Sequence, residues 1–364
     1  RVFCGSISAF LLSSAVAAAA CETPYTVQQG DTLALIARAN LGNVERYVEI
    51  YDLNREAIGA DPDRILVGLR LDLPCQVPSL VKASAWNRLP DADTLAAQLP
   101  GRVQVVDIRP ASKLEGGLIP GALSMPYRQW RGPAQSPGTP PSDTVLSDRI
   151  GAAGLRLDRP IVVVSSSAQP FDFGRAAYVY WVLKSVGARQ IGILQGGTSA
   201  WIEAGRAVTA QPARARPYRA SVTLSDAWRA QLSEVDAIAR GQSKGALLDA
   251  RPSSAYLRQS KAKIPLASTL PYAQNRPASF AHNTLRTAPT HQDGVLSMLD
   301  QLKSAAVSWE TETVVSFCDT GELGALNWFY ASEIAGIKNV KLYPESATGW
   351  KASGRALSVP GVTN

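Results

Sequence analysis

The chain has 364 residues, of which 46% are hydrophobic and 18% charged, and its formal net charge is +7. This length leaves room for two or three domains with sizeable cores, and the composition excludes a disordered or fibrous protein. The mild positive charge suits small anionic molecules. Because no patch combines basic with aromatic residues, we expect no nucleic-acid partner.

The first 20 residues have the composition of an export signal. Residues 9–20 are almost all apolar or small, and Ala18-Ala19-Ala20 is a pattern that signal peptidases cleave. An apolar stretch of about 12 residues is too short to remain as a membrane-spanning helix. We therefore predict a signal peptide at 1–20, truncated at its start, no transmembrane span in the mature chain, and a periplasmic or cell-envelope location.

The cysteines agree with export to an oxidising compartment. Cys4 lies within the predicted signal, which leaves Cys21, Cys75 and Cys318. We predict a disulfide between Cys21 and Cys75, which contributes about 4 kcal/mol to stability in the chain-entropy model. A lipid anchor on Cys21 is the alternative. In either case Cys318 is left unpaired.

Residues 21–78 have the pattern of a small separate unit. It opens with Tyr-Thr-Val-Gln-Gln-Gly-Asp-Thr-Leu at 25–33 and ends with an apolar run at 65–73. Two amphipathic stretches lie between them, so we predict the order strand, helix, helix, strand. The opening motif resembles that of the LysM domain, a small βααβ fold.

The resemblance to LysM domains implies binding of a peptidoglycan glycan in a groove between two loops. A folded spacer that binds nothing is the alternative. The groove residues that the resemblance implies are Gly30, Asp31, Thr32, Leu33, Pro62, Asp63 and Ile65.

From about residue 85 the chain repeats itself. Val-Asp-Ile-Arg-Pro at 106–110 returns as Leu-Asp-Ala-Arg-Pro at 248–252, and Trp-Ile-Glu-Ala-Gly-Arg at 201–206 returns as Trp-Lys-Ala-Ser-Gly-Arg at 350–355. An Ile-Pro segment lies between these motifs each time. Such a repeat in constant order indicates a duplicated domain. We predict a first copy at 85–210 and a second copy at 220–358, joined by a segment rich in Pro and Arg.

Each copy alternates short apolar runs with helical patterns, as at 103–106, 161–164 and 191–194 in the first copy. This alternation predicts an α/β domain with a parallel sheet covered by helices. Functional loops are then expected at the carboxyl ends of the strands.

Cys318 lies where a predicted strand at 314–317 passes into an apolar pattern of helical spacing that begins at Ala325. Loop N–H groups and the positive end of a helix converge there, so we expect a lowered thiol pKa and a reactive thiolate. The alternative is a small buried core residue. The neighbouring acids Asp319 and Glu322 act against ionisation of the thiol and repel a dianionic donor.

Both copies resemble rhodanese domains. The resemblance rests on the paired Asp-x-Arg and Ile-Pro segments, the loop after the Val-Val strand and the closing Gly-Trp-x-x-x-Gly. The tandem arrangement resembles thiosulfate and 3-mercaptopyruvate sulfurtransferases, in which an inactive first copy supports an active second one. The resemblance implies that Cys318 takes sulfane sulfur from a thiosulfate-like or persulfide donor and passes it to a thiol or cyanide-like acceptor, without cofactor or metal.

The resemblance also assigns the residues around Cys318. Arg251, beside Asp249, would hold an anionic donor, and a structural ion pair between these two residues is the alternative. The expected active-site loop comprises Asp319, Thr320, Gly321, Glu322, Leu323 and Gly324.

The sequence departs from the best-known members at this loop. It lacks the basic residues that follow the cysteine in the thiosulfate-specific type, and also the Cys-Gly-x-Gly of the mercaptopyruvate type. The sequence therefore does not identify the sulfur donor. A non-catalytic scaffold protein of the cell envelope is the alternative function.

The first copy has no cysteine in the corresponding loop. Aligning the Val-Val pairs at 162–163 and 314–315 places Ser166 opposite Cys318. A serine without a neighbouring base cannot carry sulfane sulfur, so we predict that the first copy is structural.

Overall fold

The computed structural model describes residues 24–41, 47–59, 61–73, 86–99, 101–114, 116–136, 138–166, 169–256, 268–278 and 312–359. The chain divides into two compact units, Arg1–Ala85 and Trp86–Asn364, which we describe separately. The predicted signal peptide and the predicted disulfide between Cys21 and Cys75 lie outside the described residues. Among the described helices, none combines the length and the hydropathy that crossing a bilayer requires.

The smaller unit is built on two short antiparallel strands, with Tyr25 opposite Leu71. Its elements are β1 (Tyr25–Thr26), α1 (Leu33–Leu41), α2 (Tyr47–Leu53), α3 (Arg55–Ile58) and β2 (Arg70–Leu71). Asn54 ties the end of α2 to β2, because its side-chain amide donates to the carbonyl oxygen of Asp72 at 2.7 Å and accepts from the Asp72 N–H at 2.8 Å. The core side chains are Val27, Leu33, Ile36, Ala37, Ile50 and Leu71.

The first copy of the duplicated domain contains a four-stranded parallel sheet of order β4-β3-β5-β6. All four residues of β5 are buried, as expected for a sheet covered on both faces. The strands are β3 (Gln104–Asp107), β4 (Leu123–Ser124), β5 (Ile161–Val164) and β6 (Ile191–Ile193). The helices are α4 (Ala92–Ala96), η2 (Ala111–Lys113), η3 (Tyr127–Trp130), α5 (Asp143–Ala153), α6 (Pro170–Ser185) and α7 (Gly197–Glu203).

The second copy has the same topology, with the parallel order β10-β9-β7-β8. The predicted α/β class and the predicted duplication are therefore confirmed. Its strands are β7 (Gly245–Asp249), β8 (Gln274–Asn275), β9 (Thr313–Phe317) and β10 (Val340–Leu342). Its helices are η4 (Asp226–Trp228), α8 (Leu232–Ala239), α9 (Ser253–Tyr256), α12 (Glu322–Trp328), the π-helical η5 (Phe329–Ile334) and α13 (Ser346–Ala352).

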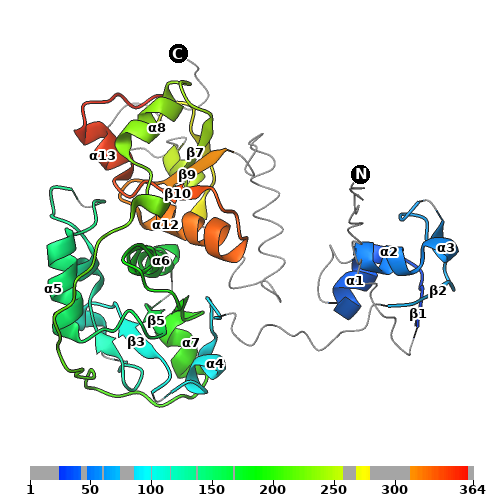
Figure 1. Cartoon of the computed structure of the whole chain (residues 1–364), viewed down its shortest axis with the longest axis horizontal. Coiled ribbons are helices and arrows are strands. Elements are labelled where there is room, and N and C mark those ends of the chain that lie inside the picture. Colours follow the sequence, from blue (N-terminus) through cyan, green and yellow to red (C-terminus); the bar gives the residue numbers. More distant parts are fainter. Residues whose placement is uncertain are drawn as a thin grey trace, which may run out of the picture. The chain divides into compact units, whose positions relative to one another are not determined.

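The two copies share one apolar core, in which α6 of the first copy packs against α12 of the second (Figure 1). These are the helices that follow the loops of interest in each copy. The approach is close at Gly174, where an added Cβ would lie 2.6 Å from the carbonyl oxygen of Glu322.

A buried carboxylate joins the copies beside this helix pair. Glu333 is 2% exposed and lies 2.7 Å from the ammonium of Lys184 on α6, while the hydroxyl of Tyr180 donates to it at 2.8 Å. Arg88 reaches the same carboxylate at 3.1 Å. The first copy therefore holds the second through both apolar packing and an ion-pair network.

Candidate active site

Cys318 is the first residue after β9, and α12 begins four residues later at Glu322. β9 is a central strand of its sheet, paired with β7 on one side and β10 on the other. The loop at its carboxyl end therefore lies between the ends of two neighbouring strands. The predicted passage from strand to loop to helix around Cys318 is confirmed, but the helix begins three residues earlier than predicted, so Glu322, Leu323 and Gly324 belong to α12 and not to the loop. Among the described residues, Cys318 is the one free cysteine.

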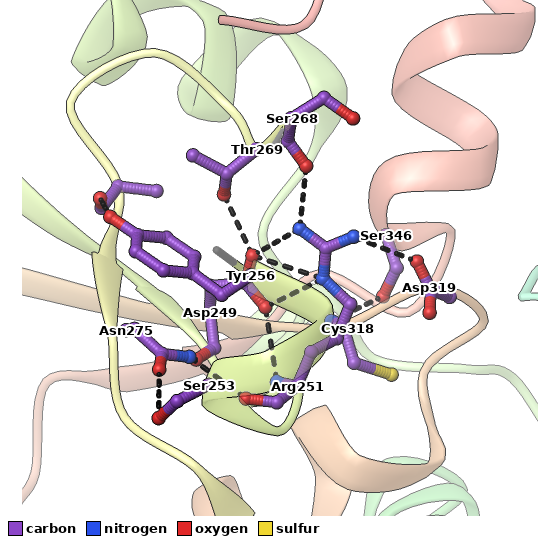
Figure 2. Close-up of polar contacts among 11 residues, drawn as sticks. Asp249, Arg251, Ser253, Tyr256, Ser268, Thr269, Asn275, Cys318, Asp319 and Ser346 are labelled. Atoms are coloured by element: carbon purple, nitrogen blue, oxygen red, sulfur yellow. Dashed lines mark hydrogen bonds and ion pairs between the residues drawn. The ribbon is translucent and has the colours of Figure 1, made fainter. Parts of the chain in front are cut away.

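The backbone of the loop folds around the sulfur. The N–H of Gly321 donates to Cys318 Sγ at 3.0 Å. Gly321 has a φ of 102°, a conformation that L side chains rarely adopt, and a Cβ there would lie 2.7 Å from the carbonyl oxygen of Pro344. Ser346 fixes the start of the loop, because its hydroxyl accepts the Cys318 N–H at 3.1 Å (Figure 2).

The environment of the thiol differs from the prediction in one respect. Burial raises the pKa of the Cys318 thiol above its ordinary value of 9.0, and the charge of Glu322 acts in the same direction. N–H groups of Gly324, Thr320 and Gly321 oppose this effect without overcoming it. The prediction of a lowered thiol pKa is therefore wrong, because burial of the side chain to 2% exposure outweighs the end of a short helix.

Asp249 and Arg251 form a buried ion pair directly beside the loop (Figure 2). Arg251 Nε and Nη2 lie 2.9 and 2.5 Å from the two carboxylate oxygens of Asp249. Arg109 binds Asp107 in the same way in the first copy, at 3.0 and 2.6 Å. This pair therefore belongs to the architecture of both copies, which fits the structural alternative for Arg251.

The remaining donor of Arg251 faces the cysteine loop. Its Nη1 lies 3.1 Å from a carboxylate oxygen of Asp319, which is 64% exposed (Figure 2). In the first copy the corresponding Nη1 of Arg109 instead donates to the carbonyl oxygen of Lys113 at 3.2 Å. Arg251 thus already contacts an anionic group next to Cys318, and that group is part of the chain.

The first copy contributes an arginine to the loop that sequence reasoning missed. Arg131 Nη2 donates to the carbonyl oxygen of Thr320 at 2.7 Å, and its Nη1 lies 3.6 Å from the carboxylate of Glu322. Its guanidinium also lies over the rings of Tyr178 and Tyr127, at 4.6 and 5.4 Å from their centres. Since this contact joins residues 189 positions apart, no local motif indicates it.

The sheet pairing corrects the alignment of the two loops. Asp107 lies opposite Val164, and Asp249 lies opposite Phe317, so the residue after each central strand is Ser165 in the first copy and Cys318 in the second. The prediction that Ser166 corresponds to Cys318 is therefore wrong by one residue. The backbone hydrogen bonds agree with this alignment. The carbonyl oxygen of Ser165 accepts the N–H of Thr198 on α7, which follows β6, and the carbonyl oxygen of Cys318 accepts the N–H of Ala347 on α13, which follows β10.

Residues of the smaller unit predicted to contact a glycan lie at two of its loops. Leu33 is 3% exposed and belongs to the core, so its side chain does not face a ligand. The carboxylate of Asp31 accepts from the hydroxyl of Tyr25 at 2.8 Å and from the N–H of Gln28 at 2.7 Å. The positions that remain partly or fully exposed are Gly30, Asp31, Thr32, Pro62, Asp63 and Ile65.

Comparison with known proteins matches the two copies separately to one family. The rhodanese-like domain model matches residues 91–204 and 233–353. A protein of Saccharopolyspora erythraea assigned as a thiosulfate sulfurtransferase is 28% identical over 270 residues, which cover 68% of this chain and 85% of that protein. One of Synechococcus elongatus with the same assignment is 25% identical over 260 residues, covering 69% and 78%.

A solved structure shows the same fold. SseA from Escherichia coli, described as a 3-mercaptopyruvate sulfotransferase with the rhodanese fold, superimposes with a TM-score of 0.58 at 18% identity. The match covers 71% of this chain and 98% of SseA. The likeness therefore extends over the whole tandem arrangement.

Proposed function

We propose, from the premise that the chain belongs to the rhodanese-like domain family and is a sulfurtransferase, that Cys318 carries the transferred sulfur as a persulfide. The observation that carries this proposal is the N–H of Gly321 at 3.0 Å from Cys318 Sγ, in a loop at the carboxyl end of a central strand. Oriented N–H groups stabilise an anion and cost no reorganisation when charge develops on the sulfur.

The transfer proceeds in two displacements on sulfur. In the first, Cys318 gives up its proton as its sulfur attacks the outer sulfur of the donor; a sulfur–sulfur bond forms as the donor's own bond to that sulfur breaks, and the leaving group keeps the electron pair and takes up the proton. In the second, the thiolate of the acceptor attacks the outer sulfur of the persulfide, and Cys318 returns to a thiolate. No net oxidation occurs, so no cofactor is required.

The charges around the loop favour some donors over others. The carboxylate of Asp319 already forms an ion pair with Arg251 at 3.1 Å, and Glu322 is the first residue of α12. A dianion such as thiosulfate meets both carboxylates, whereas a persulfide carries less charge to its reacting end. We therefore propose a small or protein-bound persulfide as the preferred donor and a thiol as the acceptor.

Turnover assays test this function. The purified chain is given thiosulfate with cyanide, mercaptopyruvate with a thiol, or glutathione persulfide with a thiol, and each rate is compared with that of Cys318→Ser. Turnover that the substitution removes supports the proposal, with the persulfide donor fastest. Absence of turnover with every donor would leave only the binding-scaffold function.

We propose further that the smaller unit holds the protein to peptidoglycan outside the cytoplasm. The proposal rests on the resemblance of residues 25–33 to the LysM opening and on exposed residues at two loops, among them Gly30 and Asp63. Co-sedimentation of the full chain with purified peptidoglycan tests it, with Asp63→Ala expected to weaken retention. A chain that stays in the supernatant at every salt concentration contradicts the proposal.

A further inference from the structure

A cavity of about 610 Å³ opens at the carboxyl end of the sheet in the first copy. Ser165 and Ser166 line it, together with residues that follow β3 and residues of the first two turns of α6. The cavity therefore lies where the second copy has its cysteine loop. Ser165 and the corresponding Cys318 are both buried, at 3% and 2% exposed, so the cavity is reached past the serine side chains and the residues around them rather than through an exposed nucleophile.

The cavity wall carries more positive than negative charge. Arg175 is matched by Asp172 at 3.0 Å, and Arg109 by Asp107 at 2.6 Å. The charged lining residues are Arg109, Lys113, Arg128, Arg175, Asp172 and Glu322.

Among the described residues, two of these cations have no carboxylate paired with them. In the part of the chain that the structure describes, Glu322 pairs with Arg131 at 3.6 Å, while no carboxylate forms an ion pair with Lys113 or Arg128. Within the described part of the chain, the wall thus presents to a ligand two positive charges that no ion pair neutralises.

The rest of the wall is largely apolar. It includes Ile108, Pro110, Ala111, Pro126 and the ring of Tyr127. The volume of about 610 Å³ lies within the range of small-molecule sites, which are typically apolar pockets with a few converging polar groups. An inorganic anion would contact the cations and leave the apolar surface exposed to water, whereas an organic anion would use both.

We propose that the first copy binds a small organic anion, with a flat apolar body and one carboxylate or sulfonate, in this cavity. The apolar body lies against Tyr127 and the prolines, and the anionic group faces Lys113 and Arg128. Binding here involves no sulfur transfer and does not depend on Cys318. The first copy is then a ligand-binding domain as well as a support for the second.

A pair of matched probes measures the contribution of the negative charge. The probes are 8-anilinonaphthalene-1-sulfonate and N-phenyl-1-naphthylamine, which share the aromatic body and differ by the sulfonate. Equilibrium dialysis and fluorescence with the full chain are expected to show one saturable site that prefers the sulfonate about fivefold, the effect of two partly exposed charges. Equal affinity for both probes overturns the proposal.

Substitutions locate the site. Lys113→Met combined with Arg128→Met is expected to weaken sulfonate binding about fivefold, and Asp172→Asn to strengthen it about twofold because it removes a negative charge from the wall. The matched control is Arg159→Met combined with Arg189→Met, since these residues line a separate cavity of about 620 Å³ in the same copy.

The control and Asp172→Asn keep the proposal falsifiable if the first double variant folds poorly. The control variant is expected to bind the sulfonate as the unmodified chain does. Equal weakening in both double variants, or unchanged or weaker binding in Asp172→Asn, overturns the assignment to this cavity.

Discussion

The two copies of the domain differ least in their sheets and most in one loop. Both sheets have the same strand order, and both place an Asp-x-Arg ion pair at the end of the strand next to that loop. After the neighbouring strand, the second copy turns sharply at Gly321, whose N–H contacts the sulfur of Cys318, and the first copy carries Ser165 and Ser166 in the wall of a cavity. The two copies thus share their sheets and a buried Asp-x-Arg ion pair, and they differ in the loop that follows the neighbouring strand.

The comparison also shows that the copies are not independent. Arg131 of the first copy binds the loop of the second, and Glu333 of the second binds Lys184 of the first. A copy that lacks the cysteine therefore still shapes the loop that contains it. Substitutions in the first copy and in the second copy separate the contribution of the cysteine loop itself from that of the contacts between the copies.

Exchange of the residues at the ends of the central strands should give the largest effect. Cys318→Ser is expected to lower turnover about a thousandfold or more, because a serine hydroxyl neither ionises near neutral pH nor holds sulfane sulfur. Ser165→Cys in the same chain should not restore turnover, because α6 begins five residues after Ser165 whereas α12 begins four residues after Cys318, so the two loops do not fold alike around this position. Donor-saturated steady-state rates check both, and restored turnover would contradict the asymmetry.

Loss of the carboxylate that joins the copies should give the largest effect on stability. Glu333→Ala leaves the ammonium of Lys184 in a mostly buried site without its partner, and we expect unfolding free energy to fall by about 3 kcal/mol. Urea unfolding at neutral pH measures this. Glu234→Ala is the matched control, because its pair with Lys341 is about 30% exposed on both sides and should cost less than about 1 kcal/mol.

The same carboxylate predicts a dependence of stability on pH. Burial alone would raise the pKa of Glu333, but Lys184, Tyr180 and Ser332 hold it below the ordinary value of 4.5. A depressed folded-state pKa contributes stability above the unfolded pKa, and this contribution is lost as pH falls through the folded value. The difference between the unmodified chain and Glu333→Gln should therefore shrink below about pH 4.5; a constant difference would contradict it.

Replacement of Arg131, the arginine of the first copy that contacts the cysteine loop of the second, should have an intermediate effect on turnover. Arg131→Met keeps most of the side-chain volume but removes the hydrogen bond to the Thr320 carbonyl and the counter-charge of Glu322. We expect turnover to fall about tenfold, the effect of losing a charged hydrogen bond. Arg189→Met, an exposed arginine that lines a separate cavity of the first copy, serves as the control and should retain turnover within about twofold.

Neutralisation of Glu322, the first residue of α12, should give the smallest effect. Glu322→Gln removes a charge that raises the pKa of the Cys318 thiol, so that pKa should fall and alkylation by iodoacetamide at pH 8 should accelerate about threefold. The rate profile against pH distinguishes this from a change in exposure. A pH profile that is unshifted, with a uniformly higher rate, would show that the substitution opened the loop instead.

Much of this architecture follows from the sequence pattern. The apolar run of β9, the glycine-containing loop and the helical spacing after Ala325 place Cys318 correctly, because strands, turns and helices leave local periodicities. The Asp-x-Arg motif recurs after an apolar run in each copy, and this repeat indicates that the two copies contain equivalent sheets. The position of Ser165 could not be read in this way, since the register of a loop of different length is set by hydrogen bonding between strands.

Two properties of the site lie beyond local pattern. The direction of the Cys318 pKa depends on burial, which arises from packing of the two copies into one core. The contact of Arg131 with Thr320 joins two copies and has no counterpart in the spacing of either motif. Both are consequences of tertiary packing.

The most direct test of the central claim is the mass of the peptide that contains Cys318 after exposure of the full chain to a sulfur donor. The claim that Cys318 carries the sulfur predicts a gain of one sulfur atom on this peptide, removed by a thiol acceptor, and no gain on the peptide that contains Ser165. An unchanged Cys318 peptide in a sample that turns over the donor would contradict it.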